Sequence, residues 1–400
     1  MKTGNPFILF FPSFHSFFFF IPFCLLLTSC KSSSQQETKS KVKEVTLPYI
    51  IDIEKNIDKV KELPVSLIAN SLEYIPLETN KSCLLKRVDK LSFTDSFIFI
   101  SDFNKLLQFD RKGKFIRQIG KNGKGPGEYV YVMAFSVNEQ KSKIYIRDYI
   151  PEMDVFDFNG KYSGSFPVNY PITPILCFDG NKIAGSIPNG PKSADPIEYN
   201  LVIYSNNGTV LKEFKNHQKR RSKQGITFPV YSLYVFNHNL RYKDYGSDSL
   251  FTVRGDSLEP YAIFNLGKMK MELDPDYSKG NPKQLIEELK HKIWISNVIE
   301  NTGCLFITFR YGLTDSMIYC SFEKQTSQVN ILKGYIFKNA DNLYFWPKYV
   351  YKDSILVDFI DASDFLEKSS SGEKKSNTEL SQLASRIKEE DNPILIITKP

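Results

Sequence analysis

Residues 98–119 read IFISDFNKLLQFDRKGKFIRQI, and residues 144–166 read IYIRDYIPEMDVFDFNGKYSGSF, which are two versions of one pattern. The glycine of the first turn, Gly113, recurs 47 residues later as Gly160. Each version holds short apolar runs separated by turns, in which Asp, Asn and Gly tolerate the left-handed backbone. A period in the forties that is built from short strands is typical of propeller blades, each a sheet of four antiparallel strands.

Further strand-like runs continue this spacing along the chain. They form a third unit, a fourth, a fifth and a sixth, over residues 182–214, 249–265, 304–332 and 342–359. We therefore predict an all-β fold, a six-bladed β-propeller of four-stranded antiparallel blades with short helical insertions, one of them at 282–289. Because a circular array leaves open sheet edges unless its ends meet, the apolar run 394–397 should join a blade with the edge-like strand 71–77.

The N-terminus indicates export. Lys2 is the only charge before a long apolar run, which closes with Leu27-Thr28-Ser29-Cys30. A basic residue, an apolar core and small residues before a cleavage point form a secretory signal. The last four residues resemble the bacterial lipobox, in which the cysteine is acylated and becomes the new N-terminus. An uncleaved membrane anchor is the alternative, and Pro12 and Pro22 weaken the long helix that it would need.

We predict three parts: a lipoprotein signal peptide over residues 1–29, a flexible tether over 30–45 and the propeller over 46–400. The tether has too few apolar side chains to repay its ordering entropy. We predict that lipid attached at Cys30 holds the protein in the cell envelope, at the outer membrane. The attachment should be stable, because two or three acyl chains bind a membrane far more firmly than one. The first acidic residue after the lipid is Glu37, which favours the periplasmic face over the cell surface.

Bulk composition is that of a globular protein, with 42% hydrophobic and 24% charged residues and a net charge of +7. The basic excess is scattered along the chain, so we predict no nucleic-acid partner. Histidine is scarce and no cysteine pair has metal-ligand spacing, so we predict no metal site and no cofactor. Buried free thiols are favoured for the four cysteines of the propeller, with a disulfide between the last two as the alternative: Cys83, Cys177, Cys304 and Cys320.

Six residues are candidates for ligand binding: Asp102, Lys121, Lys124, Glu128, Arg147 and Asp148. Asp102, Arg147 and Asp148 end the second strand of their blades at equivalent places, where such residues hold turns by hydrogen bonds. Alternatively they line the channel mouth, where an Arg fork could bind a carboxylate or sugar hydroxyls. The other three belong to the glycine-rich stretch 120–129, which lacks the Lys-Ser/Thr pair and the helix of a phosphate loop and so predicts a crossing between blades.

The chain resembles the six-bladed β-propeller lipoproteins of gut Bacteroidota, which are related to NHL-type and TolB-like propellers. The resemblance extends from Leu63 to Lys399 and, beside the lipobox, rests on YIPLE at 74–78, the glycine-rich stretch, DSLF at 248–251 and DNP at 391–393. It implies the fold but no reaction. Nothing in the sequence matches the metal ligands of NHL-related lyases and lactonases.

Taken together, these patterns favour a lipid-anchored propeller that binds a glycan, a peptide or a partner protein through its loop-bearing face. A hydrolase or lyase with an active site at the channel mouth is one alternative, and a structural subunit of an envelope complex is another. We expect a binding protein rather than an enzyme and assign no catalytic residue. A binding module should expose an apolar patch, to which Tyr129, Tyr131 and Tyr149 could contribute, whereas an enzyme needs a concave site with perturbed polar groups.

Overall fold

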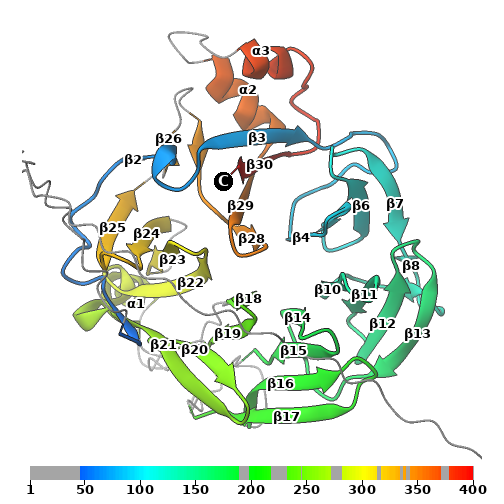
Figure 1. Cartoon of the computed structure of the whole chain (residues 1–400), viewed down its shortest axis with the longest axis horizontal. Coiled ribbons are helices and arrows are strands. Elements are labelled where there is room, and N and C mark those ends of the chain that lie inside the picture. Colours follow the sequence, from blue (N-terminus) through cyan, green and yellow to red (C-terminus); the bar gives the residue numbers. More distant parts are fainter. Residues whose placement is uncertain are drawn as a thin grey trace, which may run out of the picture. The chain divides into compact units, whose positions relative to one another are not determined.

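Strands dominate the structure, a computed structural model that describes residues 46–188, 198–217, 232–244, 246–271, 282–312, 317–333, 337–338, 343–370 and 378–399. The predicted signal peptide and tether, Cys30 included, lie outside these residues. Six sheets of four antiparallel strands, one of them extended by a fifth strand, are arranged around a common centre (Figure 1). The predicted six-bladed propeller is therefore confirmed.

The first three blades follow one another along the chain, each running from an innermost to an outermost strand (Figure 1). Blade 1 contains β4 (Lys90–Phe93), β5 (Phe97–Ser101), β6 (Leu106–Asp110) and β7 (Phe115–Ile119). Blade 2 contains β10 (Ala134–Asn138), β11 (Lys143–Arg147), β12 (Glu152–Asp157) and β13 (Tyr162–Pro167). Blade 3 contains β14 (Ile175–Phe178), β15 (Lys182–Ser186), β16 (Tyr199–Ser205) and β17 (Val210–Lys215). A small parallel pair, β8 (Lys121–Asn122) and β9 (Glu128–Tyr129), lies in the crossing from blade 1 to blade 2.

Blades 4 and 5 carry additions to this plan. Blade 4 contains β18 (Leu233–Phe236), β19 (Asn239–Lys243), β20 (Ser249–Arg254) and β21 (Ser257–Asn265), and β1 (Tyr49–Asp52) pairs in parallel with β21. A short 3-10 helix η2 (Gly267–Met269) and the predicted helical insertion α1 (Pro282–Leu289) follow. Blade 5 contains β22 (Ile293–Glu300), β23 (Cys304–Tyr311), β24 (Met317–Glu323) and β25 (Gln328–Lys333). The four propeller cysteines are free thiols, and the alternative disulfide is wrong because Cys320 lies opposite Ile307 rather than Cys304.

Blade 6 joins the two ends of the propeller, as predicted. It contains β28 (Tyr349–Tyr351), β29 (Ile355–Ile360), β30 (Ile394–Lys399) and β3 (Ser71–Pro76), with α2 (Ala362–Ser370) and α3 (Thr378–Ala384) inserted before β30. The C-terminal strand β30 pairs with β29 on one side and with the N-terminal strand β3 on the other.

One strand assignment was wrong. Residues 342–347 were predicted to open blade 6, but β27 (Tyr344–Phe345) pairs with β26 (Phe337–Lys338), which pairs in turn with β2 (Leu63–Pro64) outside the blade, next to the 3-10 helix η1 (Val65–Leu67). These apolar residues join a core that blades 5 and 6 share with the helical insertion, where Phe345 and Trp346 are buried together with Phe365 of α2.

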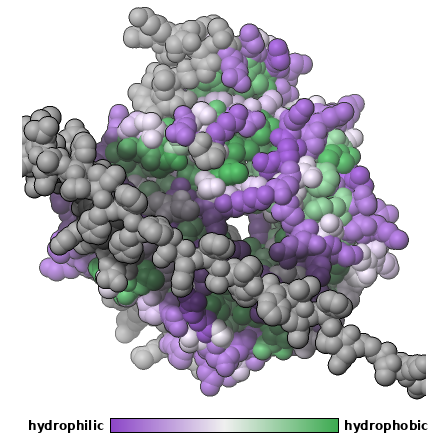
Figure 2. All heavy atoms as spheres, viewed as in Figure 1, coloured by the Kyte–Doolittle hydropathy of each residue, from purple (hydrophilic) through white to green (hydrophobic). Residues whose placement is uncertain are grey.

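Apolar side chains between neighbouring blades hold the ring together, while hydrophilic residues cover much of the rim (Figure 2). Phe99 of blade 1 and Phe135 and Phe156 of blade 2 form one such buried layer. The repeated glycine is required in at least one turn, because Gly113 has φ +84° and a Cβ there would lie 2.2 Å from the carbonyl oxygen of Pro76.

The antiparallel order of the strands sorts the connections into two sets. Turns that join the first strand to the second, or the third to the fourth, leave one face of the ring. Connections from the second strand to the third, and from one blade to the next, leave the opposite face, which we call the loop face. All six predicted ligand-binding residues lie in or beside connections of the loop face.

Candidate functional site

Asp102 and Asp148 are buried at the loop face and bind backbone amides. The Asp102 carboxylate accepts hydrogen bonds from the N–H groups of Asn104 at 3.1 Å and Lys105 at 3.0 Å, just beyond β5. The Asp148 carboxylate accepts bonds at 2.9 Å from the N–H groups of Val130 and Tyr131, in the crossing that enters blade 2. Each carboxylate therefore fixes the backbone of a loop.

Arg147 is buried beside Asp148 and acts on the same loops. Its Nη1 donates hydrogen bonds to the carbonyl oxygens of Asp148 and Ile150, and burial lowers the pKa of its guanidinium. The Asp148 carboxylate also accepts a bond from the N–H of Tyr149. This geometry matches the turn-holding interpretation of Asp102, Arg147 and Asp148. Direct ligand binding by these residues stays a prediction.

Replacing Arg147 with Ala should lower the free energy of unfolding by about 1–3 kcal/mol, because two loop carbonyls lose a charged donor in a buried site. Urea unfolding measures this loss. The control is Arg254→Ala, because Arg254 makes only an exposed ion pair with Glu259 and should change stability by less than about 1 kcal/mol. An Arg147→Ala protein as stable as the wild type would remove the turn-holding role.

The other three predicted residues surround the glycine-rich turn. Lys121 and Lys124 are exposed, and Lys121 Nζ lies 3.0 Å from the Glu128 carboxylate. The pKa of Glu128 is lowered mainly by a hydrogen bond from the Gly125 N–H, and the neighbouring Lys121 ammonium lowers it further. Their charges are thus available at the surface of the loop face, and ligand binding by all three stays a prediction.

The sequence analysis missed Phe103, which lies between β5 and β6. It has φ +71°, a strained conformation that a bulky side chain rarely adopts and that persists only where its surroundings impose it. Its ring stacks on Tyr131 with centroids 4.6 Å apart, and the Arg87 guanidinium lies over its ring at 5.6 Å. Asp102 hydrogen bonds and the bond from the Val132 N–H to the Phe103 carbonyl hold this backbone in place.

Phe103 belongs to a group of large apolar side chains on the loops of blades 1 and 2, which we call the aromatic patch: Phe103, Tyr131, Met133, Tyr149 and Ile150. Tyr149 is 76% exposed, and Tyr131, Met133 and Ile150 are exposed as well. Two of the three tyrosines suggested by the sequence therefore reach the surface. Tyr129 does not: it is fully buried, and its hydroxyl donates to the Ile119 carbonyl at 2.7 Å and accepts from the Leu106 N–H at 3.1 Å.

In the described part of the chain, no group of three or more His, Cys, Asp or Glu side chains is placed to hold a metal ion. Among the same residues, no helix has the length and apolarity needed to cross a membrane.

The fold recurs in a solved bacterial protein. A solved protein of Bacteroides fragilis, described as exported, is 19% identical with a TM-score of 0.68, and the match covers 88% of this chain and 99% of that one. The extracellular domain of a hybrid two-component system of B. thetaiotaomicron is 11% identical with a TM-score of 0.40, covering 72% of this chain and 32% of that one. The WD40 domain of Neurospora crassa Pan2 is 11% identical with a TM-score of 0.35, covering 62% and 65%. No curated protein matches the chain. Residues 48–399 match the family described as Domain of unknown function (DUF4934), and the chain belongs to that family.

Proposed function

We propose that this protein is a lipid-anchored propeller of the cell envelope that binds a partner protein through the aromatic patch. The observation that carries this proposal is the exposure of the patch on the loop face. Anchoring through Cys30, at the periplasmic face of the outer membrane, is supported by the lipobox and the tether that follows it. The likeness to a B. fragilis protein described as exported agrees with this address.

The composition of the patch favours a protein over a glycan or a free peptide. Tyr, Phe, Met and Arg are enriched at the cores of protein interfaces, and all four occur here, with Arg87 over the Phe103 ring. The carboxylates of Asp102 and Asp148 fix the loops that carry the patch, so little entropy is lost when a partner binds. Lys86 is exposed next to Arg87, and its backbone N–H donates to the Asp102 carboxylate at 3.3 Å. Its positive charge favours a partner surface that carries acidic residues at the rim of the interface.

A photo-crosslinking amino acid at position 149, in the lipoprotein expressed in its native cells, tests the proposal. We expect a covalent adduct with one envelope protein, identified by mass spectrometry. The same probe at position 211 is the matched control, because Leu211 is also an exposed apolar residue but lies on the outer strand of blade 3. Release of the Cys30→Ser protein from the membrane fraction checks the anchor.

With the crosslinked partner purified, Tyr149→Ala should weaken binding by about tenfold or more, the effect of removing an aromatic residue at the centre of an interface. The melting temperature should stay unchanged because this side chain is largely exposed. Equal crosslinking from positions 149 and 211, or an adduct that carries only glycan, would contradict a protein partner.

A further inference from the structure

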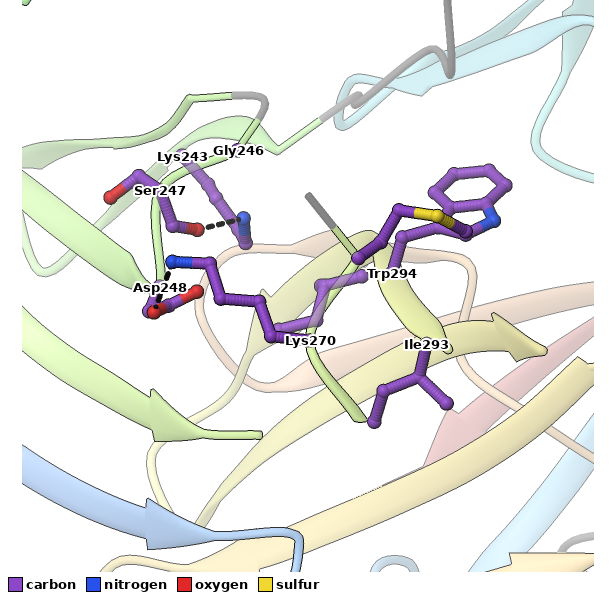
Figure 3. A pocket seen from close by; sticks show the side chains of 9 residues that line it. Lys243, Gly246, Ser247, Asp248, Lys270, Ile293 and Trp294 are labelled. Atoms are coloured by element: carbon purple, nitrogen blue, oxygen red, sulfur yellow. Dashed lines mark hydrogen bonds and ion pairs between the residues drawn. The ribbon is translucent and has the colours of Figure 1, made fainter. Parts of the chain in front are cut away.

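A cavity lies on the loop face and is lined by residues of blades 4 and 5 and of the connections beside them. These two blades lie across the ring from blades 1 and 2, whose loops carry the aromatic patch (Figure 1). The cavity is small, with a volume of about 30 Å³, which is room for a small ligand group but not for a large molecule. One wall is polar and comes from the end of β19, the loop after it and the segment that follows η2: Lys243, Ser247, Asp248 and Lys270. Ile293 supplies apolar surface on the side away from Lys243 (Figure 3), and Met271 is a further apolar residue of the lining.

Lys243 is an unusual element of this wall, because its side chain is a buried cation without a direct counter-ion. The residue is 4% exposed, and its Nζ donates to the carbonyl oxygens of Asp244 at 3.1 Å and Ser247 at 2.8 Å. An ammonium group has three N–H donors, so these two neutral acceptors leave one unused. No carboxylate of the described chain lies within 4.0 Å of Nζ, and burial lowers the pKa of Lys243 to about 8.

The neighbouring charges are already engaged elsewhere. Asp248 lies 2.7 Å from Lys270 Nζ at the mouth of the cavity (Figure 3). The Asp244 carboxylate accepts hydrogen bonds from Asn200 Nδ2 at 2.9 Å and from the Tyr242 hydroxyl at 3.3 Å, and it acts on Lys243 only at longer range. The two carboxylates balance the two ammonium groups in number, but neither binds Lys243 directly.

We propose that this cavity binds the oxyanion of a small ligand, a carboxylate or a phosphate, as the direct partner of Lys243. The oxyanion accepts the remaining Lys243 donor, and a charge-assisted hydrogen bond of this kind is stronger in a desolvated site than the bonds to neutral carbonyls. Lys270 adds a second cation at the mouth, and the apolar part of the ligand packs on Met271 and Ile293. The site is separate from the protein-binding surface proposed above.

Titration of the purified protein with inorganic phosphate and, separately, with propionate tests this site, at constant ionic strength maintained with chloride. We expect saturable binding of one of the two anions in calorimetry, which identifies the oxyanion class. Lys243→Met, which keeps the length of the side chain but removes its charge, should weaken that binding roughly tenfold or more.

Lys90→Met is the matched control and should bind as the wild type does. Lys90 is also a cation whose pKa burial lowers to about 8, and its Nζ donates to the Ile175 carbonyl at 3.0 Å, but it lies in β4 on the other side of the ring. A measurement on the wild-type chain is independent of how the variants fold. In carbon-13 spectra of the lysine side chains, the bound anion should raise the apparent pKa of Lys243 and leave that of Lys90 unchanged.

The proposal is overturned if neither anion binds beyond the effect of chloride. It is also overturned if Lys243→Met binds as tightly as Lys90→Met, or if the pKa values of both lysines shift equally. None of these outcomes bears on crosslinking from position 149, so this site and the protein-binding surface can fail separately.

Discussion

Glu300→Gln should lower the free energy of unfolding by about 3–5 kcal/mol, the loss expected when one member of a buried ion cluster is neutralised. Glu300 is 1% exposed at the end of β22, and its carboxylate accepts hydrogen bonds from four groups. Two of them are cations, Arg241 Nε at 3.0 Å and Lys324 Nζ at 2.5 Å. The other two are the hydroxyls of Tyr261 at 2.8 Å and Tyr234 at 3.3 Å.

The size of this effect follows from what Gln would leave behind. Arg241 and Lys324 are both buried, and their positive charges would face each other without a carboxylate between them. The ring of Tyr261 lies 3.7 Å from the Arg241 guanidinium, and the ring of Phe236 lies 3.9 Å from Lys324 Nζ, but aromatic faces compensate a buried cation only in part. Because Arg241 belongs to blade 4 and Lys324 to blade 5, the loss should loosen the contact between these blades.

Urea unfolding measures the effect, and Glu259→Gln provides a control of identical chemistry. Glu259 pairs with Arg254 at 3.4 Å, and both side chains are more than half exposed, so this change should cost less than about 1 kcal/mol. Equal stability losses in the two variants would show that burial of the Glu300 cluster does not matter for stability.

The fold was predictable because its main signal is local and repeated. Gly113 and Gly160 mark the same turn in two blades. The outer strand β13 alternates in exposure, whereas inner strands such as β5 and β11 are buried almost throughout and consist of continuous apolar runs. Residues 342–347 were misassigned because their apolar side chains are buried against α2, a contact that no local pattern shows. A short apolar run cannot reveal which of two nearby cores it joins.

The candidate site was predictable in position but not in detail. The repeated strand ends predicted Asp102, Arg147 and Asp148 as candidates, and these residues make hydrogen bonds to backbone groups of the loop face. The positive φ of Phe103 could not be inferred, since it arises from the hydrogen bonds of neighbouring loops and not from the residue type.

A pattern in the sequence could have identified Lys243 as a counterpart of Arg147. Lys243-Asp244 ends the second strand of its blade as Arg147-Asp148 does in blade 2, and in both the cation donates to carbonyls of the following loop. The repeat therefore marks a cation that holds a loop. Whether a cavity opens beside that cation depends on the next blade, which for Lys243 contributes Ile293.

Asn392→Ala should lower the free energy of unfolding by about 2–4 kcal/mol, because three backbone groups lose a hydrogen bond at the closure of the ring, although the Glu78 carbonyl keeps the Cys83 thiol as a donor. Asn392 is buried just before β30, and its Oδ1 accepts a hydrogen bond from the Leu85 N–H at 2.8 Å. Its Nδ2 donates to the carbonyl oxygens of Glu78 at 2.7 Å and Cys83 at 3.0 Å. One side chain thus ties the C-terminal strand to the segment that leads from β3 into blade 1.

Asn392→Ala should loosen the closure of the ring first, and this local effect can be distinguished from destabilisation of the whole propeller. Hydrogen exchange should become faster in β3 and β30, where the two ends of the chain pair, before it changes in blade 3, because local opening requires only the contacts that hold that region. Asp391→Ala is the control: its carboxylate accepts only a local, exposed bond from the Lys388 N–H at 2.8 Å, so it should cost less than about 1 kcal/mol. If Asn392→Ala instead accelerated exchange equally in all blades, the ring would open as one unit, and the closure between β3 and β30 would not be its weakest contact.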